Sequence, residues 1–259
     1  MKKFTKLTAF ALALVMALGL LAGCGGSNSD NSTPSGDDTA KTKLVVATSP
    51  DFPPFESLEG GEVVGIEVDI LNKIAEKMGM ELDIQQMDFD SVIPGVQAGK
   101  FDVGMSGITV TDKRKENVDF SSVYFMAAQA IVVTADSGIT GKADLEGKKV
   151  SVQTGTTAEE YCMGNGYEVL AFTANNDAAA ALTAGKVDAW VVDNEVALAM
   201  APELGLTVLD EAMTSEPYAF AFQKGSELVA PFNEALDALL ADGTVEKIFQ
   251  QYGVTYIAP

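Results

Sequence analysis

The sequence predicts an α/β fold with mostly parallel sheets arranged in two similar lobes. Strand-like and helix-like segments alternate from Leu44 to Tyr252, which is typical of parallel sheets covered by helices. A short unit also occurs twice, because residues 97–102 and 183–188 are identical at four of six positions. Each copy combines a helix end, a glycine stop and a strand start, so the repeat favours two related lobes.

In the first half of this region, β-branched runs indicate strands and segments with an apolar period near 3.6 indicate helices. The clearest helix begins at Gly65-Ile66, buries one apolar side that includes Ile70 and Ile74, and ends at Gly79. Strands are predicted at 44–48, 81–84, 101–105 and 130–133, and helices at 66–78, 89–98 and 111–117.

The second half repeats this rhythm and closes with two helices. Strands are predicted at 149–152, 168–172, 187–192 and 218–222. Helices are predicted at 157–163, 176–184, 193–200, 228–240 and 244–252, with one further helical turn at 144–147.

The N-terminal segment resembles a bacterial lipoprotein signal. Residues 1–23 combine a basic start with an apolar run of ~15 residues, short of the ~20 needed for a membrane span. Leu21-Ala22-Gly23-Cys24 resembles a lipobox, which implies that Cys24 is acylated and anchors the protein to the membrane. An ordinary signal peptide or an uncleaved anchor, with Cys24 incidental, is the alternative. Residues 24–43 are polar and glycine-rich, so we expect a flexible tether.

Composition excludes several classes of function. The chain has 37 acidic against 17 basic residues, a formal charge of −20, and no cluster of basic residues longer than Lys113-Arg114-Lys115, which disfavours nucleic acid. It has no histidine, which excludes histidine metal sites and Ser-His-Asp triads. The two cysteines offer no disulfide framework. We expect no metal and no cofactor.

A few residues could bind a small anion or cation. Arg114, the only arginine, follows a strand end and suits a carboxylate, or it pairs with Asp112 or Glu116 on the surface. Gly155-Thr156-Thr157 opens a helix and is a weak signal for an anion site. Asp193 ends a strand and could hold an ammonium group or cap the next helix.

The sequence alone does not decide the roles of two phenylalanines and one cysteine. Phe52 and Phe89 lie at element junctions, where they could be core packing or aromatic walls around a ligand. Cys162 is interpreted as a structural or incidental thiol.

Six ordered blocks carry a resemblance that covers the chain from about Leu44 to Tyr252. They are residues 49–56, 65–70, 93–95, 106–115, 118–121 and 145–150. These blocks resemble the bacterial extracellular solute-binding proteins, family 3, the amino-acid receptors of ABC importers. The resemblance implies the type II periplasmic-binding-protein (Venus-flytrap) fold with two hinge strands, near 129–133 and 218–222. Lobe 1 would comprise 44–131 plus 223–259, and lobe 2 would comprise 132–222.

The resemblance also implies roles for single residues. Arg114, with Thr109 and Thr157, would bind the ligand α-carboxylate, while Asp193 and the Gly107 carbonyl would bind the α-ammonium. The ligand side chain would be flanked by Phe52 and Phe89, and its identity would be read by Gln153 and Ser49. Several relatives that bind glutamine or cationic amino acids carry aspartate where Ser49 stands. In this chain, a negative charge that pairs with a cationic ligand side chain must come from elsewhere, such as Glu56, or be absent.

The expected function is therefore an extracytoplasmic lipoprotein that binds a polar L-amino acid, neutral or basic, between its lobes. It would act as a monomer, without catalysis, and deliver the ligand to an ABC importer permease. The alternatives are a dehydratase of small carboxylic acids on the same fold and a tethered amino-acid sensor.

Overall fold

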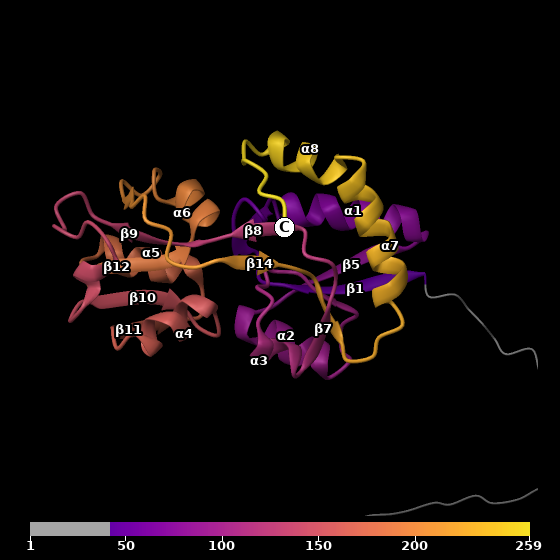
Figure 1. Ribbon diagram of the computed structural model, residues 1–259, viewed down its shortest axis with the longest axis horizontal. Coiled ribbons are helices and arrows are strands. Elements are labelled where there is room, and N and C mark those ends of the chain that lie inside the picture. The colour runs from indigo at the N-terminus through magenta and orange to yellow at the C-terminus, as the bar shows by residue number, and fades with distance from the viewer. Residues whose placement is uncertain (1–41) are drawn as a thin grey trace, which may run out of the picture. The chain divides into compact units, whose positions relative to one another are not determined.

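A computed structural model describes residues 42–259 (Figure 1). The signal segment, Cys24 and nearly all of the expected tether lie outside these residues. Within 42–259, none of the helices has both the length and the apolar character that a membrane span requires.

The first lobe is a five-stranded sheet with the order β5-β1-β6-β15-β7. Its strands are β1 (Lys43–Thr48), β5 (Glu81–Gln86), β6 (Val103–Gly104), β7 (Val118–Phe120) and β15 (Ala221–Gln223). The strand β1 pairs in parallel with β5 and β6, whereas β15 is antiparallel to β6 and β7.

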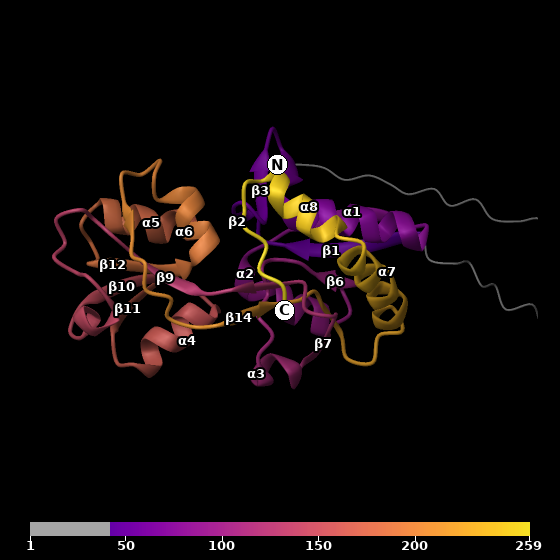
Figure 2. The same ribbon diagram turned by 45° about the horizontal axis from the view of Figure 1, so that its top comes forward.

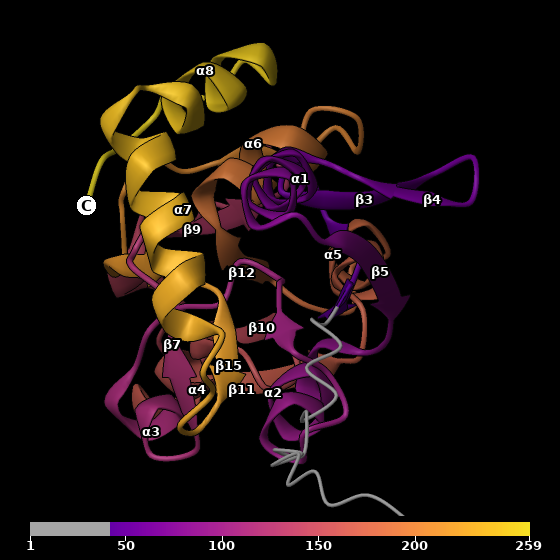
Figure 3. The same cartoon turned by 90° about the vertical axis from the view of Figure 1, so that its right-hand side faces the viewer.

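Helices cover both faces of this sheet (Figure 3). On one side lie α1 (Ile66–Met78), α7 (Val229–Ala241) and α8 (Thr244–Gln251), and α8 also packs on α1 (Figure 2). On the other side α2 (Phe89–Gln97) packs on β1, β6 and β15, and the short helix α3 (Asp112–Lys115) packs on β7. The predicted helix 66–78 is confirmed, and Gly79 ends it in the left-handed conformation at φ 66°.

The second lobe repeats the arrangement with the order β11-β10-β12-β9-β13. Its strands are β9 (Gln129–Val133), β10 (Lys149–Gln153), β11 (Glu168–Phe172), β12 (Ala189–Asp193) and β13 (Thr207–Val208). Its helices are η1 (Lys142–Leu145, a 3-10 turn), α4 (Thr157–Gly164), α5 (Asn175–Thr183) and α6 (Asn194–Met200). The strand β10 pairs in parallel with β11 and β12, as β1 does with β5 and β6.

The repeated sequence unit folds in the same way in both lobes. Gly99 and Gly185 both adopt positive φ, 69° and 66°, one residue beyond the C-cap residues of α2 and α5. The Asp102 carboxylate then accepts a hydrogen bond from the Val45 N–H at 2.8 Å, and the Asp188 carboxylate accepts one from the Lys149 N–H at 2.8 Å. Each copy therefore ties the start of one strand to the neighbouring parallel strand of its own sheet, β1 in the first lobe and β10 in the second.

Two antiparallel strands connect the lobes: β8 (Phe125–Ala127) and β14 (Glu216–Tyr218) (Figure 1). The predicted crossings at 129–133 and 218–222 are displaced, since β9 lies wholly in the second sheet and β15 in the first. The predicted single strand 218–222 is wrong for the same reason. Its continuous apolar run spans the end of β14 and the start of β15, and both are buried.

Other differences concern short elements. The strand predicted at 101–105 is only β6, two residues long. A three-stranded sheet made of β2 (Asp51–Phe52), β3 (Glu56–Glu59) and β4 (Glu62–Val64) was not predicted, because such short strands leave little pattern. This small sheet brings Asp51 and Phe52 to the second lobe.

Candidate ligand-binding site

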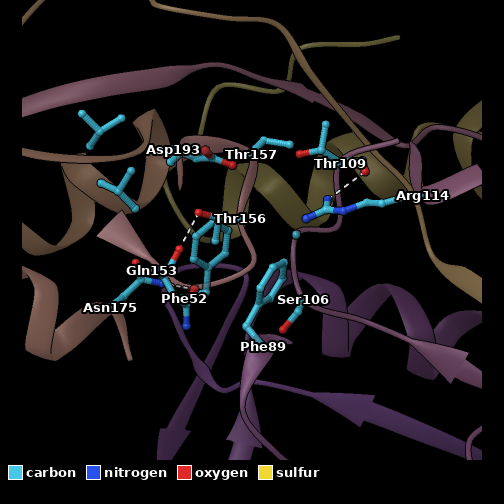
Figure 4. A pocket seen from close by; sticks show the side chains of 14 residues that line it. Phe52, Phe89, Ser106, Thr109, Arg114, Gln153, Thr156, Thr157, Asn175 and Asp193 are labelled. Atoms are coloured by element: carbon cyan, nitrogen blue, oxygen red, sulfur yellow. Dashed lines mark hydrogen bonds between the residues drawn. The ribbon is translucent and has the colours of Figure 1, made fainter. Parts of the chain in front are cut away.

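A cavity is lined by residues of both lobes (Figure 4). The structure brings eight of the nine predicted site residues around it: Phe52, Phe89, Gly107, Thr109, Arg114, Gln153, Thr157 and Asp193. Five lining residues were not singled out from the sequence: Ser106, Ala158, Asn175, Val191 and Val192. A sixth, Thr156, belongs to the weak anion signal Gly155-Thr156-Thr157.

Ser49, the ninth predicted residue, does not line the cavity. Its hydroxyl donates to the Asp51 carboxylate at 3.1 Å, and its N–H donates to Ser106 Oγ at 2.9 Å. Ser49 thus supports two neighbours of the cavity rather than facing it. The sequence does not show whether the Ser49 side chain faces the cavity or its neighbours, because the direction of this side chain follows from the turn after β1.

Glu56 also lies away from the cavity, contrary to its suggested role as a negative charge for the ligand. Its side chain is fully buried next to Glu67, and burial and that like charge raise its pKa well above the usual range. Glu67 is held by the Gly107 N–H at 2.9 Å and by the Tyr124 hydroxyl. Glu56 therefore lies behind the site, where its surroundings disfavour the charged form of its carboxyl.

The guanidinium of Arg114 is fixed in the cavity by three contacts. It donates to the Thr109 carbonyl at 2.9 Å and to the Gly155 carbonyl of the other lobe at 3.1 Å. Its carbon lies 5.6 Å from the centre of the Phe89 ring, a cation–π arrangement. The alternative of surface pairing is wrong for Asp112, which pairs with Lys115 at 3.3 Å.

Asp193 supplies a buried carboxylate on the second lobe. It accepts a hydrogen bond from the Tyr218 hydroxyl. Burial raises the pKa of Asp193 to about 7, the charge of Glu216 adds to this, and the Tyr218 bond and Arg114 oppose it. Although Asp193 stands at the N-cap position of α6, its side chain makes no capping bond, so the helix-cap alternative is wrong. A buried acid next to a second acid favours binding of a cation.

The Thr157 hydroxyl is already occupied within the protein. It accepts from Gln129 Nε2 at 2.9 Å and donates to Glu216 Oε2 at 3.0 Å. Thr157 and Ala158 can instead bind an anion through their backbone N–H groups. N–H groups in the first turn of α4 have no intrahelical acceptor. The sequence gives no signal for Glu216, because only the crossing strand β14 brings it here.

On the other side of the Phe52 and Phe89 rings from Arg114, Gln153 and Asn175 form a polar wall (Figure 4). Gln153 Nε2 donates to the Thr173 carbonyl at 3.0 Å and to Asp51, while Gln153 Oε1 accepts from Asn175 Nδ2 at 2.8 Å. The Gln153 amide therefore has one fixed orientation. Residues 42–259 hold no group of three acidic or cysteine side chains suited to a metal ion.

The two lobes and the cavity between them define a two-lobed solute-binding protein. The chain belongs to the bacterial extracellular solute-binding proteins, family 3, which it matches over residues 44–255.

Individual proteins that are similar to this chain support its place in the family. The chain is 35% identical to the arginine-binding extracellular protein ArtP of Bacillus subtilis over 90% of this chain and 92% of ArtP. An ancestral arginine-binding protein has been solved bound to arginine and bound to glutamine. It is 41% identical over 82% of this chain and 98% of its own, with TM-scores of 0.77 and 0.78.

A third relative is a binding protein that is the precursor of an enzyme. The ancestral amino acid-binding protein AncCDT-1, a precursor of cyclohexadienyl dehydratase, is 35% identical. The match covers 82% of this chain and 95% of that protein, with a TM-score of 0.76.

Proposed function

We propose that this protein is the extracytoplasmic receptor of an ABC importer and binds a basic L-amino acid, with arginine as the first candidate. The observation that carries the proposal is the pair of opposite charges on one cavity: the Arg114 guanidinium from the first lobe and the Asp193 carboxylate from the second. Arg114 would bind the α-carboxylate of the ligand, together with the first turn of α4. Asp193 and the Gly107 carbonyl would bind the α-ammonium.

The ligand side chain would run between the rings of Phe52 and Phe89 toward Gln153 and Asn175. An acidic side chain is disfavoured, because Arg114 is the only basic side chain that lines the cavity. Asp51 and Glu216 add negative charge near it. A ligand with a cationic or neutral polar side chain suits these negatively charged surroundings. Relatives named for arginine, and one solved with arginine or glutamine, support the same choice.

Ligand binding would select the closed arrangement of the lobes. Each lobe carries part of the site, so a ligand that contacts both parts favours closure by its difference in affinity for the closed and open forms. The permease would then recognise the closed form. The protein would act as a monomer and without catalysis.

Attachment to the membrane would depend on acylation of Cys24. Replacing Cys24 by serine is expected to release the protein from cells into the medium, while a Cys162→Ser variant stays in the membrane fraction. Immunoblots of both fractions measure this. Unchanged retention of the Cys24 variant would contradict lipid anchoring.

A thermal-shift screen tests the ligand class. The purified protein is unfolded and refolded to remove bound amino acids, then mixed with each of the twenty amino acids and cystine. A ligand at 100 times its Kd adds ~2.7 kcal/mol of stability. The largest shift is expected for arginine, with smaller shifts for other basic or polar side chains. The absence of any shift would contradict the receptor proposal. Product formation from an arogenate-like or prephenate-like acid would favour the dehydratase instead.

A further inference from the structure

The carboxylate of Asp51 binds the opposite lobe. Asp51 opens β2 in the first lobe, and its Oδ2 accepts a hydrogen bond from the Asn175 N–H at 2.7 Å. Gln153 Nε2, also in the second lobe, donates to the same carboxylate at 3.2 Å. Ser49 of the first lobe donates to it at 3.1 Å. Asp51 is thus anchored on its own lobe and bonded twice to the other.

Helix α5 lacks a capping side chain of its own. Its N-cap residue is Ala174, which makes no side-chain bond to the first turn. Asn175 is the first residue of the helix, so its N–H has no intrahelical acceptor. A carboxylate is also favoured at a helix N-terminus by the helix dipole. Asp51 therefore supplies, from the other lobe, the cap that the sequence of α5 omits.

The same carboxylate orients the polar wall of the cavity. Asp51 itself does not line the cavity, but Gln153 and Asn175 do. Separating the lobes would break both cross-lobe bonds, leave α5 uncapped and release the Gln153 amide from one of its partners.

We propose that Asp51 is a positioning residue for ligand binding, which stabilises the closed arrangement by capping α5 across the cleft and holding Gln153 in place. The inference rests on the proposed function for its ligand, but the contact itself is made by protein groups alone. Its prediction is that Asp51 sets affinity without touching the ligand.

Three variants separate closure from simple helix stability. Asp51→Ala removes the cross-lobe cap, and adding Ala174→Asp to it restores a cap within α5 alone. Asp237→Ala is the matched control, because Asp237 is an exposed acid on α7 of the same lobe. Calorimetry with arginine measures Kd, and small-angle scattering of the ligand-free protein measures its radius of gyration.

We expect Asp51→Ala to raise the Kd about 10- to 100-fold, since hydrogen bonds to a charged group are lost from the closed form. Its ligand-free radius of gyration should exceed that of the wild type. The double variant should regain thermal stability but keep the weakened Kd and the larger radius. The control should match the wild type in Kd and in radius.

Recovery of the Kd in the double variant would overturn the inference, because Asp51 would then act only on α5. A Kd within twofold of the wild type in Asp51→Ala would overturn it as well. If the wild type binds no amino acid, the proposed function fails, and the radius of gyration alone decides. An equal radius in the wild type and Asp51→Ala then overturns the cross-lobe role.

Discussion

The hydroxyl of Tyr218 donates a hydrogen bond to the carboxylate of Asp193. Tyr218 ends the crossing strand β14, whereas Asp193 ends β12 in the second lobe. Both side chains are buried. The acid proposed to bind the ligand ammonium is therefore bonded to the connection between the lobes.

Ligand affinity is expected to fall as the pH decreases through 7. Burial raises the pKa of Asp193 to about 7, and an ammonium group binds the deprotonated form. Below pH 7, a proton must be released for each ligand bound, so affinity approaches a tenfold loss per pH unit. Calorimetry between pH 5.5 and 8.5 measures this slope. A flat profile would contradict the role of Asp193.

The stability of the ligand-free protein should change with pH in the opposite direction. Because the pKa of Asp193 is higher in the folded protein than its ordinary value of 3.8, the folded state binds this proton more tightly than the unfolded chain. The resulting contribution to the free energy of unfolding is complete below about pH 4 and is lost as the pH rises through 7. Urea unfolding of the wild type and Asp193→Asn across pH 4–8 isolates it. The free energy of unfolding of the wild type, minus that of Asp193→Asn, should decrease as the pH rises, because Asn mimics only the protonated carboxyl.

Replacing Tyr218 by phenylalanine should move the affinity midpoint to higher pH. The Tyr218 hydroxyl lowers the pKa of Asp193, so removing it lets the pKa rise. Tyr124→Phe is the control, because Tyr124 is a buried tyrosine that bonds Glu67 instead. An equal midpoint in the Tyr218 and Tyr124 variants would refute the coupling.

Truncation of Arg114 should weaken binding at least 100-fold. Arg114→Ala removes a charge-assisted pair with the ligand carboxylate, which costs several kcal/mol in a closed cavity. Arg114→Lys should not restore affinity, since one ammonium cannot reach the Thr109 and Gly155 carbonyls together as the guanidinium does. Lys115→Ala, an exposed neighbour, serves as the control. Near-native affinity in Arg114→Ala would exclude its role.

Alanine at Gly107 should damage both stability and binding. Gly107 has φ +51°, and a Cβ there would lie 2.5 Å from the Phe52 ring. Gly79 has a similar φ of +66° but open space around it, so Gly79→Ala measures the backbone strain alone, about 1 kcal/mol. Thermal unfolding and calorimetry of both variants compare the two positions. Equal losses of stability and affinity would show that the Phe52 contact is unimportant.

Local features of the sequence were sufficient for much of the fold. The helix 66–78, the strand 168–172 and the glycine stops at Gly99 and Gly185 depend on residues close together in the chain. The strand predicted at 218–222 failed because two buried half-strands of different sheets follow one another without a polar break. Burial hides the alternation on which strand prediction relies.

The sequence by itself determined the alternation of elements, the twofold repeat and the chemical types at the site: one arginine, one strand-end aspartate and two aromatic rings. Only the tertiary structure decided which acids reach the cavity. Asp51 and Asn175 meet across 124 positions, Glu216 arrives on a crossing strand, and Glu56 turns away into the core. These outcomes depend on how distant elements pack against one another, and spacing along the chain carries no record of that.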